Sequence, residues 1–213
     1  NGSACLRWLA RDVPNLEEAR EAAQRIVRDG KRAGEVIARI RAMTTRAVTP
    51  RERLDPNEII REVLALAGEE VKDKGMVIRA QFAEDLSSVL GDRVQLQQVV
   101  LNLVMNGIEA MIGIGERTRE LLITTENMDA NQIVVKIADS GIGLDPNARE
   151  RIFDPFYTTK PGGTGMGLSI CRSILKTHGG RLWMTANDGP GTTVHFSLPA
   201  YPGEKENAGA AAD

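Results

Sequence analysis

The stretch from Asp92 to Met111 is apolar at most positions and on every side of the helix that it predicts, with Asp92 as the N-cap. A helix that is apolar all round is buried. Its polar side chains follow one another at steps of four, four and three, so they form one stripe along the helix. They are Gln98, Asn102, Asn106 and Glu109. Because a buried polar group without a partner costs roughly 1–3 kcal/mol, the stripe is either a hydrogen-bonded core network or a site for a polar ligand and its metal.

The periodicity elsewhere predicts further helices and strands in one domain. Helices are expected over residues 55–74 and 165–177, and strands over 76–82, 121–127, 132–139, 181–188 and 192–199. A short strand is expected just before Asp92, and the last four strands pair as two antiparallel hairpins. This order predicts an α+β two-layer sandwich, with a mixed sheet packed on helices.

The first 48 residues predict a separate helical hairpin. One helix ends near Arg11, turn residues follow, and a long amphipathic helix runs from Leu16 to about Arg46. Such a hairpin has too little core alone, so we expect a dimeric four-helix bundle, with a hairpin folded back on its own domain as the alternative. The expected organisation is then a linker over 49–53, a second domain over 54–200 and a disordered tail over 201–213.

The composition fits a globular chain, because 42% of its 213 residues are hydrophobic and 26% are charged. The net charge of −2 gives no reason to expect a nucleic-acid or membrane surface. Cys5 and Cys171 are far apart in sequence and are expected to be reduced packing residues, which fits a cytoplasmic location. The sequence starts at Asn1 in what reads as the middle of a helix, so we expect a piece of a longer protein.

Two glycine-rich segments follow the polar stripe. The first is IVVKIADSGIGLD, in which Asp139 ends a β-branched run, and the second is FDPFYTTKPGGTGMGLSI, in which Lys160 precedes a helix. The alternate glycines are Gly141 and Gly143 in the first segment, and Gly163, Gly165 and Gly167 in the second. They allow close approach of the backbone to a ligand, and amides at a helix N-terminus favour bound phosphate.

In this order, the asparagine helix and the two glycine-rich segments resemble the N box, first glycine box, F box and second glycine box of the GHKL (Bergerat) ATP-binding fold. The segments NLVMNGIEAM and FDPFYTTKPGGTGMGLSI are most similar to those of sensor histidine kinases of the nitrogen-regulation type. The resemblance covers residues 54–199, with a weaker match to the family's dimerisation helices before them. It implies ATP and Mg²⁺ as cofactors, a homodimer through the N-terminal helices, and transfer of the γ-phosphoryl group to a histidine and then to the receiver domain of a response regulator.

The resemblance also implies roles for individual residues around the base and the metal. Asp139 would accept a hydrogen bond from the adenine amine, Gly141 and Gly143 would let the loop lie against the base, and Thr193 would reach it through water. Asn106 would bind Mg²⁺, because its amide oxygen is a hard ligand and magnesium keeps several waters. Asn102 lies close by on the same stripe.

The phosphates would lie against the second glycine box. Lys160 is expected on a mobile lid, where it would reach the terminal phosphates as a point charge. The residues of the expected cradle are Gly163, Thr164, Gly165, Met166, Gly167 and Leu168. In the chaperone, mismatch-repair and topoisomerase branches, the place of Asn102 resembles one that holds a glutamate base. An amide is a poor base, which favours phosphoryl transfer over hydrolysis.

The chain has only two histidines, His178 and His195, and neither lies on the N-terminal hairpin where the family places its acceptor. The acceptor is therefore expected upstream of Asn1, so this fragment should bind ATP without phosphorylating itself. Two alternatives stay open at this point. One is an ATPase that uses nucleotide as a conformational clamp, and the other is a nucleotide-sensing partner-switch module without catalysis.

Overall fold

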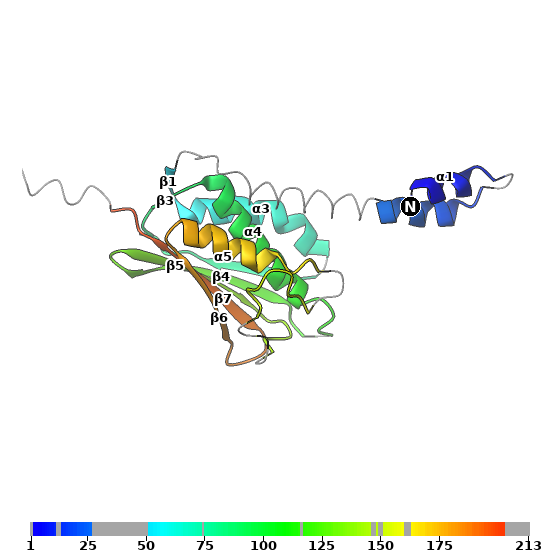
Figure 1. The fold of residues 1–213 in the computed structure, drawn as a ribbon. Coiled ribbons are helices and arrows are strands. Elements are labelled where there is room, and N and C mark those ends of the chain that lie inside the picture. The colour runs from blue at the N-terminus through cyan, green and yellow to red at the C-terminus, as the bar shows by residue number, and fades with distance from the viewer. Residues whose placement is uncertain are drawn as a thin grey trace, which may run out of the picture. The chain divides into compact units, whose positions relative to one another are not determined.

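The computed structural model describes residues 2–11, 14–26, 51–73, 75–115, 117–145, 148, 151–159 and 163–202. The chain forms two compact units, residues 1–48 and 49–213, which are treated separately here (Figure 1). Three parts of the predictions lie outside the described residues: Lys160, the expected 201–213 tail from residue 203 onwards, and the expected long hairpin helix from residue 27 onwards.

The first unit contains the predicted pair of helices as far as it is described. Helix α1 spans Gly2–Leu9, and a second helix covers residues 16–26. The side-chain oxygen of Asn15 accepts a hydrogen bond from the Glu18 N–H at 3.2 Å, so Asn15 starts the second helix. The Cys5 thiol donates to the Ala19 carbonyl at 3.4 Å, and Ala19 is buried, so small residues allow the two helices to pack closely.

The second unit is built on a five-stranded sheet in the order β2-β4-β5-β7-β6. The strands are β2 (Val77–Gln81), β4 (Glu120–Asp129), β5 (Gln132–Asp139), β6 (Arg181–Ala186) and β7 (Thr192–Pro199). Only β2 and β4 pair in parallel, so the sheet is mixed and both predicted hairpins are present. A separate two-stranded ribbon joins β1 (Glu52–Leu54) to β3 (Val89–Gly91).

Three helices cover one face of this sheet: α3 (Pro56–Asp73), α4 (Arg93–Ala110) and α5 (Gly167–Thr177) (Figure 1). Helix α4 contacts both α3 and α5 and also packs on β5. The core lies between the helices and the sheet, where Leu103, Ile123 and Ile137 are almost completely buried. The predicted α+β two-layer sandwich with a mixed sheet is therefore confirmed.

Helix α4 starts as predicted, because the Asp92 carboxylate accepts a hydrogen bond from the Gln95 N–H at 3.1 Å. The prediction that its whole circumference is buried was wrong. The Val94 side chain is 71% exposed and Leu101 is 39% exposed. The sheet and the two neighbouring helices cover the other sides of α4, and one narrow side remains in solvent.

The chain enters the second unit through β1, which overlaps the predicted linker. Glu52 and Arg53 lie opposite Gly91 and Leu90 of β3, so a three-residue strand stands where loop was expected. A stretch this short cannot show a period-two pattern in the sequence, and its pairing with β3 is a tertiary contact.

Candidate functional site

The first glycine-rich loop is fastened to the C-terminal half of α4. Asp139, at the end of β5, is only 7% exposed, and its Oδ1 accepts a hydrogen bond from the Gly141 N–H at 2.8 Å. A Cβ atom added to Gly107 of α4 would lie 3.6 Å from the Asp139 Cβ, so the Asp139 side chain lies against this helix. The Ile142 N–H also donates to the Ala110 carbonyl at the end of α4.

The second glycine-rich segment meets the same half of α4. Gly167 is the first residue of α5, and a Cβ atom there would lie 3.8 Å from the Asn106 Nδ2. Asn106 and Gly107 are consecutive, so one turn of α4 faces both glycine-rich segments. Met166 gives α5 no side-chain N-cap bond, and N–H groups at such a terminus suit an anion.

Asn102 lies one turn earlier on α4, and its surroundings bear on the two interpretations of the polar stripe. Its Nδ2 atom is buried and has no hydrogen-bond partner within the described part of the chain. The Cys171 thiol of α5 lies beside it, and burial raises the pKa of this thiol to about 12, with the neighbouring Asn102 amide lowering it to a smaller extent. A complete core network would satisfy this amide, so the described hydrogen bonds do not account for the whole stripe as a core network.

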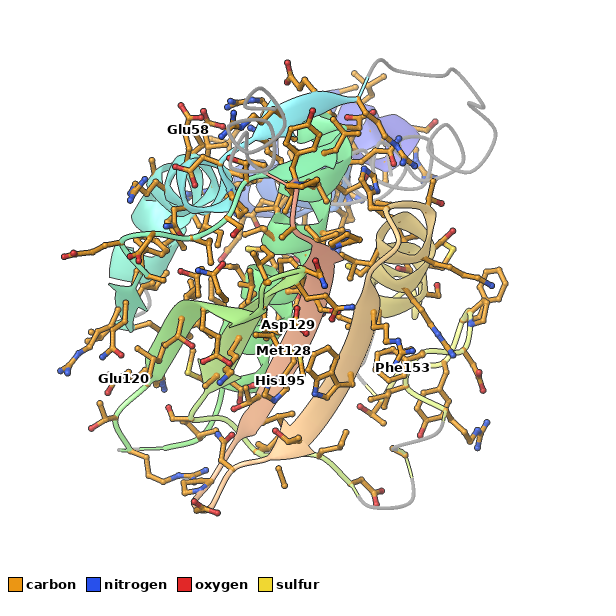
Figure 2. All side chains as sticks on the ribbon, turned by 90° about the vertical axis from the view of Figure 1, so that its left-hand side faces the viewer. Glu58, Glu120, Met128, Asp129, Phe153 and His195 are labelled. Atoms are coloured by element: carbon orange, nitrogen blue, oxygen red, sulfur yellow. The ribbon has the colours of Figure 1, made fainter. Side chains whose placement is uncertain are left out.

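The structure does not bring Thr193 to this site. Along β7, Val194 and Phe196 point into the core, so Thr193 points to the opposite face of the sheet, as does His195, whose ring stacks on Trp183 (Figure 2). Thr192 is instead buried, at 8% exposure, on the face that carries Asp139. The sequence has two adjacent threonines after Gly191. Because side chains alternate between the two faces of a strand, Thr192 lies on the same face as the apolar Val194 and Phe196, and this alternation indicates Thr192.

The segment before the second glycine box forms successive turns over residues 151–157. The Arg151 guanidinium lies 4.6 Å from the Tyr157 ring centre, and Arg172 of α5 lies 5.6 Å from the ring of Phe153, which is labelled in Figure 2. Gly165, at φ +64°, packs directly on the backbone of Phe156, so a side chain at this position would collide with it. The predicted cradle is thus held to the aromatic segment, while Lys160 lies outside the described residues.

The donor set limits which metal this site could hold. The described residues contain no group of three or more histidine, cysteine or acidic side chains placed to bind a metal ion. An ion here would instead have to take oxygens from a ligand and from an amide such as Asn106, which is the chemistry of magnesium with a nucleotide. The uncapped start of α5 and the unpartnered Nδ2 atom of Asn102 both offer N–H donors, which suit the phosphate oxygens of a nucleotide.

The other end of these helices is chemically different. The Asp92 N–H donates to the His178 Nε2 at 3.1 Å, so the His178 Nδ1 carries the proton and donates to the Ile174 carbonyl at 2.8 Å. Arg51, just before β1, donates to the Thr177 carbonyl at 2.6 Å. A surface cavity of about 190 Å³ lies here, lined in part by Arg51, His178 and Tyr201. This cavity is separate from the candidate site, which is at the start of α5.

Comparison with known proteins matches this geometry to one family. The family described as "Histidine kinase-, DNA gyrase B-, and HSP90-like ATPase" matches residues 91–202. The sensor histidine kinase TmoS of Ectopseudomonas mendocina is 32% identical over 200 residues, which cover 93% of this chain. The chain belongs to this family, in its sensor histidine kinase branch. Its second unit is the ATP-binding catalytic domain of such a kinase.

Further relatives agree with this membership. The sensor protein FixL of Bradyrhizobium diazoefficiens is 35% identical over 88% of this chain. The crystallised catalytic domain of histidine kinase ThkA, in a nucleotide-free form, matches 71% of this chain and 97% of its own length, with 37% identity and a TM-score of 0.63. A structure of ThkA in complex with response regulator protein TrrA matches 94% of this chain at 28% identity, with a TM-score of 0.73.

The chain spans only part of the curated relatives that it matches. It covers 21% of the length of TmoS and 37% of the length of FixL. Among the described residues, no helix is both long and apolar enough to cross a membrane.

Proposed function

We propose that this kinase domain binds Mg²⁺-ATP and transfers its γ-phosphoryl group to a histidine, from which it passes to the receiver domain of a response regulator. The observation that carries the proposal is the meeting of both glycine-rich segments on one turn of α4, at Asn106 and Gly107. This turn joins the expected base-binding aspartate to the uncapped start of α5. Family membership supports the same reading.

The base would lie on the Asp139 side of this turn. A carboxylate is an acceptor only, so Asp139, whose Oδ1 also accepts from the Gly141 N–H, suits a donor such as the amino group of adenine. Gly141 and Gly143 would lie against the base. Thr192, on the face of Asp139, is better placed than Thr193 to take part, through water or directly.

The triphosphate would lie on the α5 side. The N–H groups from Gly163 through Thr164, Gly165, Met166, Gly167 and Leu168 would surround it, with the positive end of the α5 dipole behind them. Lys160 would neutralise the terminal phosphate. Asn106 would hold Mg²⁺ through its amide oxygen, and the bound ion would supply charge neutralisation between the phosphate oxygens.

Asn102 favours transfer over hydrolysis. Its amide cannot take a proton from water at neutral pH, so the site lacks a general base at this position of α4. We therefore assign Asn102 to orienting the phosphates and their waters. An acceptor histidine on a helix would supply the nucleophile, because the His178 ring is bonded to the Ile174 carbonyl and the His195 ring is stacked on Trp183.

Residues 1–48 would form the dimerisation hairpin, with 49–53 as linker, 54–200 as the catalytic domain and 201–213 as its tail. Leu6 and Leu16 are 68% and 69% exposed on the described helices, which leaves apolar surface for a second copy. The ThkA structure with TrrA supports a response regulator as the partner. Both cysteines are free thiols, which fits action in the cytoplasm, where ATP is available.

A chain extended upstream to include an acceptor histidine tests this proposal with γ-labelled ATP. We expect an acid-labile, alkali-stable phosphoprotein from the extended chain without substitutions, and none from its Asn106→Ala or Asp139→Ala variants that remain folded. Steady release of phosphate without a labelled protein would support the ATPase clamp instead. Nucleotide binding with neither product would support the sensing module.

A further inference from the structure

The turn between β6 and β7 is attached to the end of β5 by one side chain. The β5–β7 ladder ends at the pair Ala138 and Thr193, one residue before the Asp139 carbonyl. This carbonyl accepts a hydrogen bond from the Asn187 Nδ2 at 2.9 Å. A side-chain amide thus continues the ladder beyond its last rung, at the aspartate of the candidate base site.

The orientation of the Asn187 amide is fixed on both sides. Its nitrogen faces the carbonyls of Asp139 and Pro190, the latter at 3.4 Å, and carbonyls can only accept. Its oxygen therefore faces Thr193, whose hydroxyl donates to it at 2.6 Å. Thr193, which does not reach the base site, has its role here instead.

Glycine makes this close approach possible. Gly191, at φ +102°, lies so near to Asp139 that a Cβ atom would overlap the Asp139 carbonyl oxygen. A Cβ atom on Gly143 would lie 3.6 Å from the Gly191 carbonyl oxygen. The β6–β7 turn and the first glycine box are therefore packed backbone to backbone, and Asn187 is the side chain that joins them.

We propose that Asn187 is a positioning residue for recognition of the base: by holding the Asp139 backbone, it fixes the carboxylate where the amino group of adenine is read. This inference rests on the proposed function, in which Asp139 accepts a hydrogen bond from that amino group. Asn187 acts through Asp139 and does not touch the ligand. Its hydrogen bonds go to Asp139, Pro190, Gly191 and Thr193, which lie on the base side of the site.

Calorimetry with Mg²⁺ and either ATP or inosine triphosphate separates this role from a general effect on folding. Inosine triphosphate carries an oxygen where ATP carries the amino group. The ratio of the two affinities therefore reports how strongly the hydrogen bond from that amino group to Asp139 contributes to binding. We expect the unmodified chain to prefer ATP by at least about tenfold. Asn187→Ala should lower ATP affinity about tenfold and inosine triphosphate affinity less than about twofold, because only the amino contact depends on the placement of Asp139.

Two further variants test which half of the amide matters. Asn187→Asp keeps an acceptor for Thr193 but loses the donor to the Asp139 carbonyl, so it should not restore the preference. Thr193→Val should reduce the preference less than Asn187→Ala, while Thr193→Ser retains the hydroxyl and the preference. These threonine variants also keep the inference testable if Asn187→Ala fails to fold.

Asn127→Ala is the matched control. The Asn127 amide also bridges two backbone groups, donating to the Asp85 carbonyl at 2.9 Å and accepting from the Ser87 N–H at 3.0 Å. It lies opposite Ile133, near the far end of β5 from Asp139, so both affinities should be unchanged.

Each outcome can be read separately. If the unmodified chain binds neither nucleotide, or binds both equally, the proposed role of Asp139 fails. If it prefers ATP and folded Asn187→Ala keeps that preference, or loses both affinities alike, the inference about Asn187 is overturned and the proposed function stands. Restored preference in Asn187→Asp would overturn it as well.

Discussion

The two ends of the α4–α5 pair differ in how completely their polar groups are satisfied. At one end, Asp92 caps α4, its N–H donates to His178 at the end of α5, and Arg51 caps the Thr177 carbonyl. Arg93, in the first turn of α4, also pairs with Glu58 and Glu62 of α3. This end is closed by the protein's own side chains.

At the opposite end the same two helices are left incomplete. Helix α5 begins without a side-chain cap, and the Asn102 Nδ2 is buried without a hydrogen-bond partner in the described part of the chain. Gly167 lies near the Asn106 amide there, and Gly107 and Gly141 lie against the Asp139 side chain. Groups that a ligand would satisfy gather at one end, so substitutions at the two ends should affect stability and nucleotide binding in different proportions.

His178→Ala should produce the largest change, at the closed end. The substitution leaves the Asp92 N–H without its acceptor and opens a cavity beside Gly91, so we expect a loss of about 2–4 kcal/mol in unfolding free energy. Affinity for Mg²⁺-ATP should change less than about twofold. Urea unfolding and calorimetry measure the two quantities.

The control for this variant is His195→Ala, at a half-exposed ring on the sheet that stacks on Trp183 and hydrogen-bonds to Thr185. Its loss should be below about 1.5 kcal/mol. A His178→Ala protein of unchanged stability and much weaker nucleotide binding would show that the two ends do not work separately.

Alkaline pH tests whether water is excluded from the interior around Cys171 of α5. Burial raises the pKa of the Cys171 thiol from 9.0 to about 12, so above pH 9 the unfolded chain releases a proton that the folded chain keeps. Stability should therefore fall as pH rises above about 9, by up to about 1.4 kcal/mol per pH unit. Urea midpoints at pH 8 and 10 show this, and Cys171→Ala should remove that part of the slope. An identical slope in the variant would mean that water reaches the thiol.

Asn102→Leu should have a smaller effect, with opposite signs for stability and binding. Leucine has a similar volume and removes the unpartnered amide, so unfolding free energy should rise by about 1 kcal/mol while ATP affinity falls. Asn57→Leu is the control, because the Asn57 amide donates to the Ala83 carbonyl and accepts from Thr125, and its loss should be destabilising. A destabilised Asn102→Leu protein would place Asn102 in a satisfied core network.

The sequence predicted the features that depend on local chemistry. Asp92 as a cap, both hairpins and the glycine-rich turns are set by residues near one another, and the order of these segments predicts the sandwich. The two glycine-rich segments are 24 positions apart between Gly141 and Gly165, yet both lie against α4.

Features set by tertiary contact were not predictable in the same way. The exposed side of α4 at Val94 and Leu101 follows from how three helices share one sheet. Asn187 stands in a turn of ordinary composition, and only the folded chain brings its amide to a carbonyl 48 residues away. The choice between Thr192 and Thr193 was within reach of the sequence, because strand alternation from Val194 and Phe196 decides it.

Calorimetry of Mg²⁺-ATP binding to the unmodified chain and to Asn106→Ala tests the central claim most directly, since Asn106 lies on the turn of α4 that faces both glycine segments. We predict that the alanine variant stays folded and loses at least about tenfold in affinity, or about 1.4 kcal/mol, with Mg²⁺ present, and much less with the metal chelated. Equal affinities of the two proteins, or the same loss with and without the metal, would contradict a magnesium nucleotide site between the C-terminal half of α4 and the start of α5.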